Sequence, residues 1–190
     1  MHKIILLWIW VILASSAFGQ NKFEKEDRMK EQMVPETAKS FVLFDGLKTK
    51  VRWYLEENLE GYSIEAKLKY DGKRYSIEFD TSGVFQDIEI EAVFGGLTLN
   101  TGMKITEELG SSFSKYKVQR LQHQYSGNIP SFSSFLYSLE TRNEYILKYE
   151  IVVKGKTEDG WNLYELLFDQ DGALEKRSRI IFRNTDNLEF

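Results

Sequence analysis

Two stretches of the chain carry the same pattern. Tyr75-Ser-Ile-Glu-Phe-Asp-Thr-Ser-Gly83 recurs 89 residues later as Tyr164-Glu-Leu-Leu-Phe-Asp-Gln-Asp-Gly172, and both copies fit Tyr-x3-Phe-Asp-x2-Gly. An Asp-Gly pair precedes each copy, at Asp71-Gly72 and Asp159-Gly160. Asp-Gly favours a two-residue hairpin, and Asp-x2-Gly favours a type I turn closed by a left-handed glycine. The repetition predicts two copies of one supersecondary unit.

The sequence around the first copy predicts a helix followed by four strands. Pro35 suits the first turn of a helix, and Asp45-Gly46 suits its end, so a helix is expected over 35–45. Apolar and polar residues then alternate up to residue 92, as half-buried antiparallel strands require. The apolar phase of these strands is Val51, Trp53, Leu55, Tyr62, Ile64, Ala66, Leu68, Tyr70, Tyr75, Ile77, Phe79, Ile88, Ile90 and Ala92.

The second half repeats this plan with an insertion. A helix is expected over 105–113, a strand over 116–125, and three more strands over 144–154, 161–168 and 173–182. Residues 126–141 form an aromatic insertion that contains Phe132, Phe135, Leu136 and Tyr137. The expected fold class is therefore α+β, with two tandem modules, each a helix packed on a four-stranded antiparallel meander sheet. Module one spans 35–92, a linker 93–104 and module two 105–190.

The N-terminus is typical of an exported protein. Residues 1–19 combine Lys3, an apolar run and Ala17-Phe18-Gly19, which predicts a signal peptide cleaved before Gln20. The apolar run is shorter than the roughly 20 residues that a membrane anchor needs. The chain has no cysteine, so an exported domain would depend on its core without disulfides. We expect a periplasmic or secreted protein without stable membrane insertion, whose charged lead-in 20–34 is a frayed helix or disordered.

The first module resembles the PepSY-like family of small exported domains, which are related in fold to the tandem-repeat β-lactamase inhibitor proteins. Trp53, Tyr75, Phe79, Asp80 and Gly83 carry the resemblance over 35–92. It is weaker over 105–182, where Arg120 or Leu121 stands in place of the tryptophan and the insertion intervenes. The resemblance implies a periplasmic protein-binding or inhibitory module with no catalytic residues.

Residue composition offers little for catalysis, metals or cofactors. Outside the predicted signal peptide His123 is the only histidine, which leaves almost nothing for a catalytic triad or a multi-histidine metal site. Acids and bases are interspersed at a net charge of −4, which argues against nucleic-acid binding because that needs a basic stripe. Asp169-Gln-Asp-Gly172 fits a hairpin turn better than a calcium loop, because its glycine comes too early. We expect no enzyme, no metal and no cofactor.

Apolar residues on the polar phase of the strands are the better indication of function. Tyr54 and Phe85 lie at outward-facing positions of the predicted strands in module one, and Trp161 and Leu163 do so in module two. The insertion adds Phe135 and Tyr137. Exposed aromatic residues are typical of protein interfaces. The alternative is that the other module or the insertion covers them. Because module two departs most from the repeated pattern, we expect specific contacts mainly there.

The sequence therefore predicts a non-enzymatic periplasmic module that binds or inhibits an unknown protein or peptide. A first alternative is a binder of a small apolar ligand or envelope component, held between the module-two sheet and the insertion. A remote alternative is a carboxylate-dependent hydrolase, since a chain with 29 acidic residues always offers carboxylate pairs.

Overall fold

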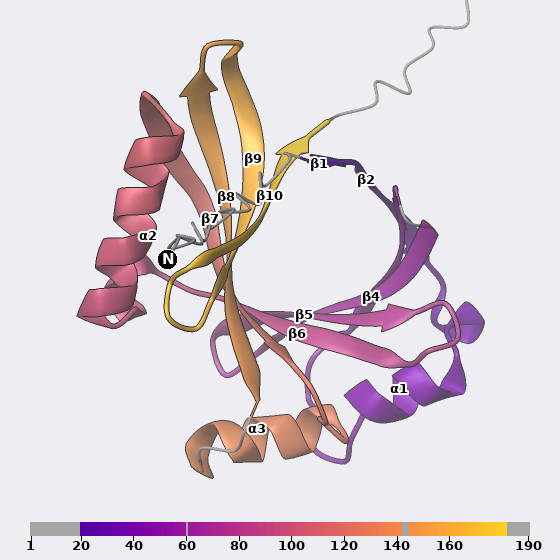
Figure 1. Cartoon of the computed structure of the whole chain (residues 1–190). Coiled ribbons are helices and arrows are strands. Elements are labelled where there is room, and N and C mark those ends of the chain that lie inside the picture. Colours follow the sequence, from indigo (N-terminus) through magenta and orange to yellow (C-terminus); the bar gives the residue numbers. More distant parts are fainter. Residues whose placement is uncertain (1–19, 60, 142–144, 182–190) are drawn as a thin grey trace, which may run out of the picture.

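A computed structural model describes residues 20–59, 61–141 and 145–181 (Figure 1). The predicted signal peptide 1–19 lies outside the described residues, as do the ends of two predicted strands at 144 and 182. The helices are α1 (Glu36–Val42), α2 (Leu99–Ser112) and α3 (Phe132–Thr141), with short 3-10 helices η1 (Glu31–Met33) and η2 (Phe94–Gly96). The strands are β1 (Gln20–Lys22), β2 (Glu24–Met29), β3 (Arg52–Asn58), β4 (Gly61–Tyr70), β5 (Lys73–Asp80), β6 (Phe85–Glu91), β7 (Lys115–Ser126), β8 (Ile146–Thr157), β9 (Gly160–Asp169) and β10 (Leu174–Ile180).

All described strands belong to one sheet. Its order is β1-β10-β9-β8-β7-β6-β5-β4-β3-β2, and every neighbouring pair is antiparallel except β1 and β10. The two halves of the chain join between β6 and β7, where Ile88 lies opposite Tyr125 and Ile90 opposite His123. The sheet is therefore continuous from one half of the chain to the other.

The N-terminal segment closes this sheet into a ring. β1 pairs with β10, and β2, which begins two residues after β1 ends, pairs with β3 at the other edge. Phe23 lies between the two strands and is 7 % exposed, so its side chain is buried where the segment changes partner. Figure 1 shows the segment bridging the gap between the two ends of the curved sheet. Both edges thus find hydrogen-bond partners that an open sheet would leave exposed.

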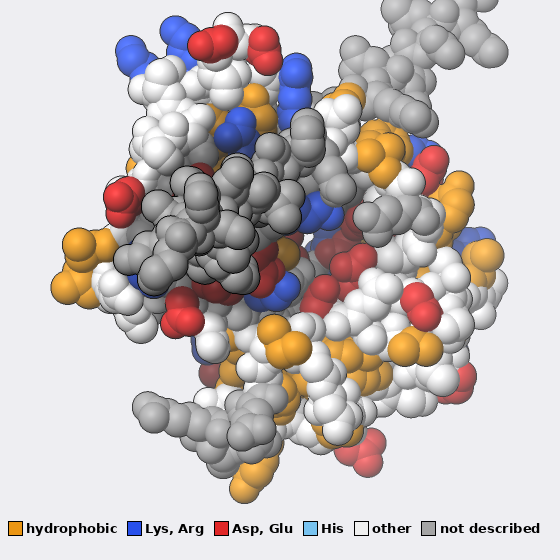
Figure 2. Space-filling model, in the orientation of Figure 1, with side chains coloured by type: hydrophobic (Ala, Val, Ile, Leu, Met, Phe, Trp, Pro, Cys, Tyr) orange, Lys and Arg blue, Asp and Glu red, His pale blue; other side chains and the backbone are white. Residues whose placement is uncertain are grey.

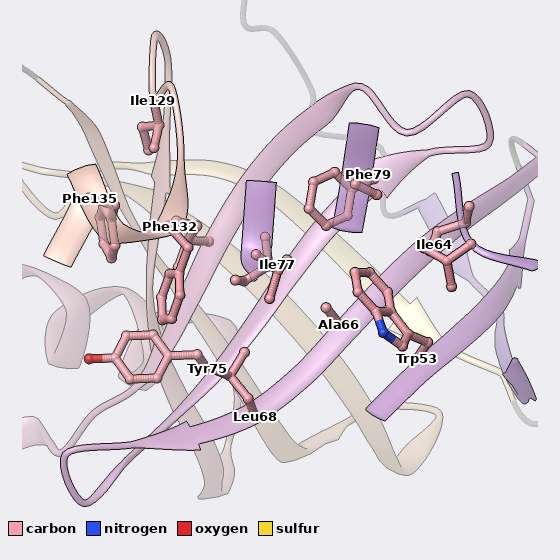
Figure 3. Close-up of a cluster of buried hydrophobic side chains, with 14 of the residues drawn as sticks. Trp53, Ile64, Ala66, Leu68, Tyr75, Ile77, Phe79, Ile129, Phe132 and Phe135 are labelled. Atoms are coloured by element: carbon pink, nitrogen blue, oxygen red, sulfur yellow. The ribbon is translucent and has the colours of Figure 1, made fainter. Parts of the chain in front are cut away.

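The apolar face of the ring points outward, against the helices. α1 and α3 cover β3–β6, where Trp53, Ile77, Phe79 and Phe132 are at most 2 % exposed (Figure 3). A second core forms where α2 covers the other half, around Ile105, Leu109, Tyr164, Leu166 and Phe168. Since side chains alternate along a strand, the charged face points into the ring.

The repeated motif is a hairpin that meets the helix of its own half. Asp80 Oδ1 accepts hydrogen bonds from the backbone amides of Ser82 (2.8 Å) and Val84 (2.9 Å), and Asp169 Oδ1 does the same for Asp171 (2.9 Å) and Ala173 (2.8 Å).

The closing glycine of each hairpin has positive φ, +86° at Gly83 and +82° at Gly172. A Cβ at Gly83 would lie 2.7 Å from Pro35 Cβ at the start of α1, and one at Gly172 would lie 3.0 Å from the Thr101 carbonyl oxygen of α2. Backbone conformation and close approach to a helix therefore both require glycine in the motif.

The expected fold class is wrong in its assembly. The predicted helices and strands are found, but they do not form two modules with separate sheets, because β6 and β7 pair into one ten-stranded sheet. The insertion also fails to cover module two. Its helix α3 packs in the first core instead, where the Phe132 ring meets Tyr75 at 5.2 Å between centroids.

Two segments outside the predicted modules also differ from expectation. The lead-in 20–34 is neither a frayed helix nor disordered, because β1, β2 and η1 lie in it. In the predicted linker 93–104, η2 is followed by the first turns of α2, whose N-cap Thr98 accepts a hydrogen bond from the Thr101 amide at 3.2 Å. Within the described ranges, the helices are too short and too polar to cross a membrane.

The ion pair of Lys22 with Glu165, at 2.6 Å, should stabilise the closed ring. Their side chains are 26 % and 12 % exposed, so Lys22→Met would leave Glu165 without this ammonium in a poorly hydrated place. We expect a loss of about 2 kcal/mol in the free energy of unfolding, measured by urea denaturation. The control Lys25→Met removes an exposed ion pair with Asp27 on β2 and should change nothing measurable. Equal stabilities of the two variants would contradict the role of Lys22.

Candidate functional site

The candidate site is the charged hollow inside the ring. It is a cavity of about 240 Å³, and every strand from β1 to β10 contributes at least one side chain to its lining. Figure 2 shows acidic and basic side chains around the opening in the middle of one face. The lining comprises Lys22, Glu26, Glu56, Asn58, Glu65, Lys67, Ser76, Glu78, Asp87, Glu89, Arg120, Gln122, Gln124, Glu150, Glu165, Leu167, Lys176 and Ser178.

Carboxylates outnumber bases in this hollow, eight against four. Lys67 Nζ lies 2.6 Å from Glu26 and 2.9 Å from Glu65, and burial lowers its pKa less than the two carboxylates raise it, so the net shift is upward. An Arg120 guanidinium nitrogen lies 3.2 Å from Glu150 Oε1, and the Glu150 side chain is 7 % exposed. These pairs and the pair of Lys22 with Glu165 neutralise part of the acidic charge.

The acids of β6 have carboxamides as their hydrogen-bond donors. Gln122 Nε2 donates to Glu89 Oε2 at 2.7 Å, and Gln124 Nε2 donates to Asp87 Oδ2 at 3.4 Å. Burial, reinforced by the charges of Glu78 and Glu150, raises the pKa of Asp87 to about 8. Burial and the charges of Glu150 and Asp87 likewise raise the pKa of Glu89 well above its usual value. At neutral pH the Asp87 carboxyl on this wall of the hollow therefore holds its proton.

One mouth of the hollow is basic. A cavity of about 610 Å³ shares Lys67, Ser76, Arg120 and Gln122 with the hollow, so the two are adjacent. Its charged lining consists of Lys50, Arg52, Lys67, Lys69, Arg74 and Arg120 against the single acid Glu91.

The pairing of the strands at this mouth places like charges side by side. Arg52 lies opposite Lys67 between β3 and β4, and Lys69 lies opposite Arg74 between β4 and β5. Like charges in directly opposite positions destabilise a sheet. Positions where a sequence sacrifices local stability in this way are often functional.

The opposite mouth lies beneath the closing segment. A cavity of about 460 Å³ there shares Lys22, Asn58, Glu165, Lys176 and Ser178 with the hollow and also touches Phe23. The segment that closes the ring therefore also borders the hollow.

Three carboxylates could in principle hold a metal ion. Oxygen atoms of Glu26, Glu56 and Glu65 lie within 4.8 Å of one another. The ammonium of Lys67 already contacts two of these residues, so the protein itself supplies a cation to this group. This arrangement does not favour a metal site.

The residues expected to form a binding surface do not lie together. Phe135 is fully buried in the first core, and Phe85 stacks on Phe41 of α1 at 4.5 Å, so both are packing residues. Tyr137, on α3, is 70 % exposed.

The remaining three candidates lie on the hollow side of the sheet. Tyr54 lies opposite Glu65, with Lys67 Nζ 5.2 Å from its ring centre. Trp161 is 48 % exposed, with Lys154 Nζ 5.8 Å from its ring centre, and Leu163 shares its face of β9. The insertion does not cover Trp161 or Leu163, since α3 packs in the other core.

His123 and the Asp169 turn play no part in the hollow. The ring of His123 lies between Tyr125 and Tyr149 on the opposite face of β7, and burial together with Lys73 lowers its pKa. The charged lining was missed because its residues look like a solvated face. One feature of the sequence could have indicated the basic mouth: residues of like charge, Lys67, Lys69 and Arg74, lie on neighbouring predicted strands.

The comparisons with known proteins support the fold and nothing finer. The chain is similar to a crystal structure of a DUF2874 family protein from Bacteroides ovatus, with a TM-score of 0.52 and 14 % sequence identity, over 77 % of this chain and 87 % of that one. No protein-family model matches the chain. No curated protein matches it either. The expected membership of the PepSY-like family is therefore corrected, since the structural neighbour is described as a DUF2874 protein and the ring is one sheet without separate tandem modules.

Proposed function

We propose that this protein is a non-enzymatic binding module that takes an acidic segment of a protein or peptide at the basic mouth of its ring. The observation that carries the proposal is the like-charge pairing of Arg52 with Lys67 and of Lys69 with Arg74. Lys67 already pairs with Glu26 and Glu65, and Arg74 pairs with Glu91 at 3.6 Å. An incoming carboxylate would therefore be held chiefly by Arg52 and Lys69.

The shape of the mouth also supports this partner. Its volume of about 610 Å³ is in the range of ligand sites, whereas the hollow behind it, at about 240 Å³, is too small for a large ligand. Tyr54 lies two residues from Arg52 on the same face of β3 and offers an aromatic contact beside the bases.

The two alternative functions have weaker support. An apolar ligand has no apolar cavity at the predicted place, because Phe132 and Phe135 are fully buried in the first core. For a carboxylate-dependent hydrolase, Asp87 and Glu89 are the best pair, but burial raises the pKa of both. General acid–base work needs two carboxyls whose pKa values are pushed apart.

We further propose that the protein acts outside the cytoplasm, from the signal-peptide pattern of residues 1–19. N-terminal sequencing of the protein isolated from its host should find Gln20 as the first residue. A protein that retains residues 1–19 would contradict export by cleavage at this position.

Binding of an N-acetylated hexaglutamate peptide tests the proposed site. Fluorescence anisotropy should show salt-sensitive binding that weakens at least tenfold in the double variant Arg52→Gln/Lys69→Gln, because the mouth loses two charges. The control Lys104→Gln/Lys115→Gln removes two exposed lysines outside the cavities and should bind like the wild type. If both double variants weaken peptide binding equally, binding depends on the net charge of the protein and not on the position of the bases, which would contradict the site.

A further inference from the structure

Two oxygen atoms on the β6–β7 wall of the hollow accept no hydrogen bond from the described residues. They are Gln122 Oε1 and Asp87 Oδ1. The Gln122 side chain is held in place because its Nε2 donates to Glu89, and the residue is only 7 % exposed. Buried acceptors without a donor are costly and uncommon in folded proteins. When Asp87 is ionised, these two atoms therefore indicate a place for a hydrogen-bond donor from outside the chain.

The neighbouring β2–β4 side of the hollow shows which donor satisfies such a set of acceptors. There the primary ammonium of Lys67 bridges Glu26 at 2.6 Å and Glu65 at 2.9 Å. The β6–β7 wall has an equivalent pair of carboxyls, Asp87 and Glu89, but no lysine among its own lining residues.

The neighbouring cations are engaged with other carboxylates. Lys22 pairs with Glu165 at 2.6 Å and Arg120 with Glu150 at 3.2 Å. Neither forms an ion pair with Asp87 or Glu89 in the part of the chain that the structure describes. Asp87 and Glu89 thus line the hollow without an ion pair to either of these two cations.

We propose that this wall is a binding site for a primary ammonium group, held by the carboxylates of Asp87 and Glu89 and the amide oxygen of Gln122. A primary ammonium has three donors, which match these three acceptors. A quaternary ammonium has none. Among the described residues, three converging carboxylates of the kind that a divalent metal ion prefers are found at Glu26, Glu56 and Glu65, and Asp87 and Glu89 are not among them.

The site goes beyond the proposed function, because it lies in the hollow and needs no acidic partner at the basic mouth. The two sites depend on different residues. The ammonium site depends on Asp87, Glu89 and Gln122, whereas the basic mouth depends on Arg52 and Lys69.

Binding at this site should release a proton. The ammonium needs ionised carboxylates, and burial together with the neighbouring acids raises the pKa of both groups, that of Asp87 to about 8. Affinity should therefore rise with pH through about 8, where Asp87 is half ionised, and level off about one pH unit higher. The charged groups that face the two carboxyls are Glu78 from β5, Glu65 from β4, Arg120 from β7, Glu150 from β8 and Lys22 from β1.

NMR titration of the wild-type protein with methylammonium tests the site without any substitution. At pH 8 and constant ionic strength we expect chemical-shift changes centred on β6 and β7, and binding at least fivefold weaker at pH 7. Tetramethylammonium, which has the same charge and no N–H donor, should bind at least tenfold more weakly. Equal shifts from tetramethylammonium or from sodium would overturn the proposal.

Two variants on the same strands separate the site from nonspecific attraction. Asp87→Asn should weaken methylammonium binding at least tenfold at pH 8, and Gln122→Leu should weaken it about fivefold. Gln119→Leu makes the same exchange at an exposed position of β7 outside the cavity lining and should bind like the wild type. Wild-type affinity in both site variants would overturn the assignment of these residues.

A second probe identifies the source of the ammonium. Tighter binding of N-acetyl-lysine methylamide than of methylammonium would assign the site to a lysine side chain of a protein. The reverse order would assign it to a small free amine. Both results support an ammonium site, whereas binding of neither probe at pH 8 would overturn it even if hexaglutamate bound normally at the mouth.

Discussion

The structure depends on one constraint: a sheet that is apolar on one face and charged on the other has turned its charged face inward. Because α1, α2 and α3 cover the apolar face from outside, the charged side chains are enclosed by the ring. Enclosed charges must be paired, hydrogen-bonded or neutralised by protonation. The ion pairs of Lys22, Lys67 and Arg120 and the raised pKa values of Asp87 and Glu89 are the ways in which this chain meets that requirement.

The closing segment and the two mouths follow from the same constraint. β1 and β2 join the two edges of the sheet, so the hollow is separated from bulk water around its whole circumference. Charge can then be sorted along the hollow, with bases at the mouth near Arg52 and Lys69 and acids on the wall near Asp87. A ring with a basic mouth and carboxyl groups on an inner wall can select a partner by the order of its charges, which is the common basis of both proposed sites.

The elements were predictable from the sequence, but their assembly was not. Alternation around Ile64 and Ile77, and the turn residues Asp80 and Gly83, are local signals, and the strands and hairpins follow from them. Pairing between β6 and β7 is a long-range choice that no local pattern encodes. The same limit applies to the site: Asp87 and Glu89 alternate with Ile88 as residues of a solvated strand do, and only closure of the ring makes them buried.

The most direct test of this account is a carbon-13 NMR titration of the side-chain carboxyl groups from pH 4 to 10. Enclosure predicts a carboxyl with a pKa of about 8 that disappears in Asp87→Asn. Asp80 is the internal reference, because hydrogen bonds from Ser82 and Val84 lower the pKa of this exposed carboxyl below its usual value. If every carboxyl, Asp87 included, titrates below pH 6, the charged face is open to water and the central claim is wrong.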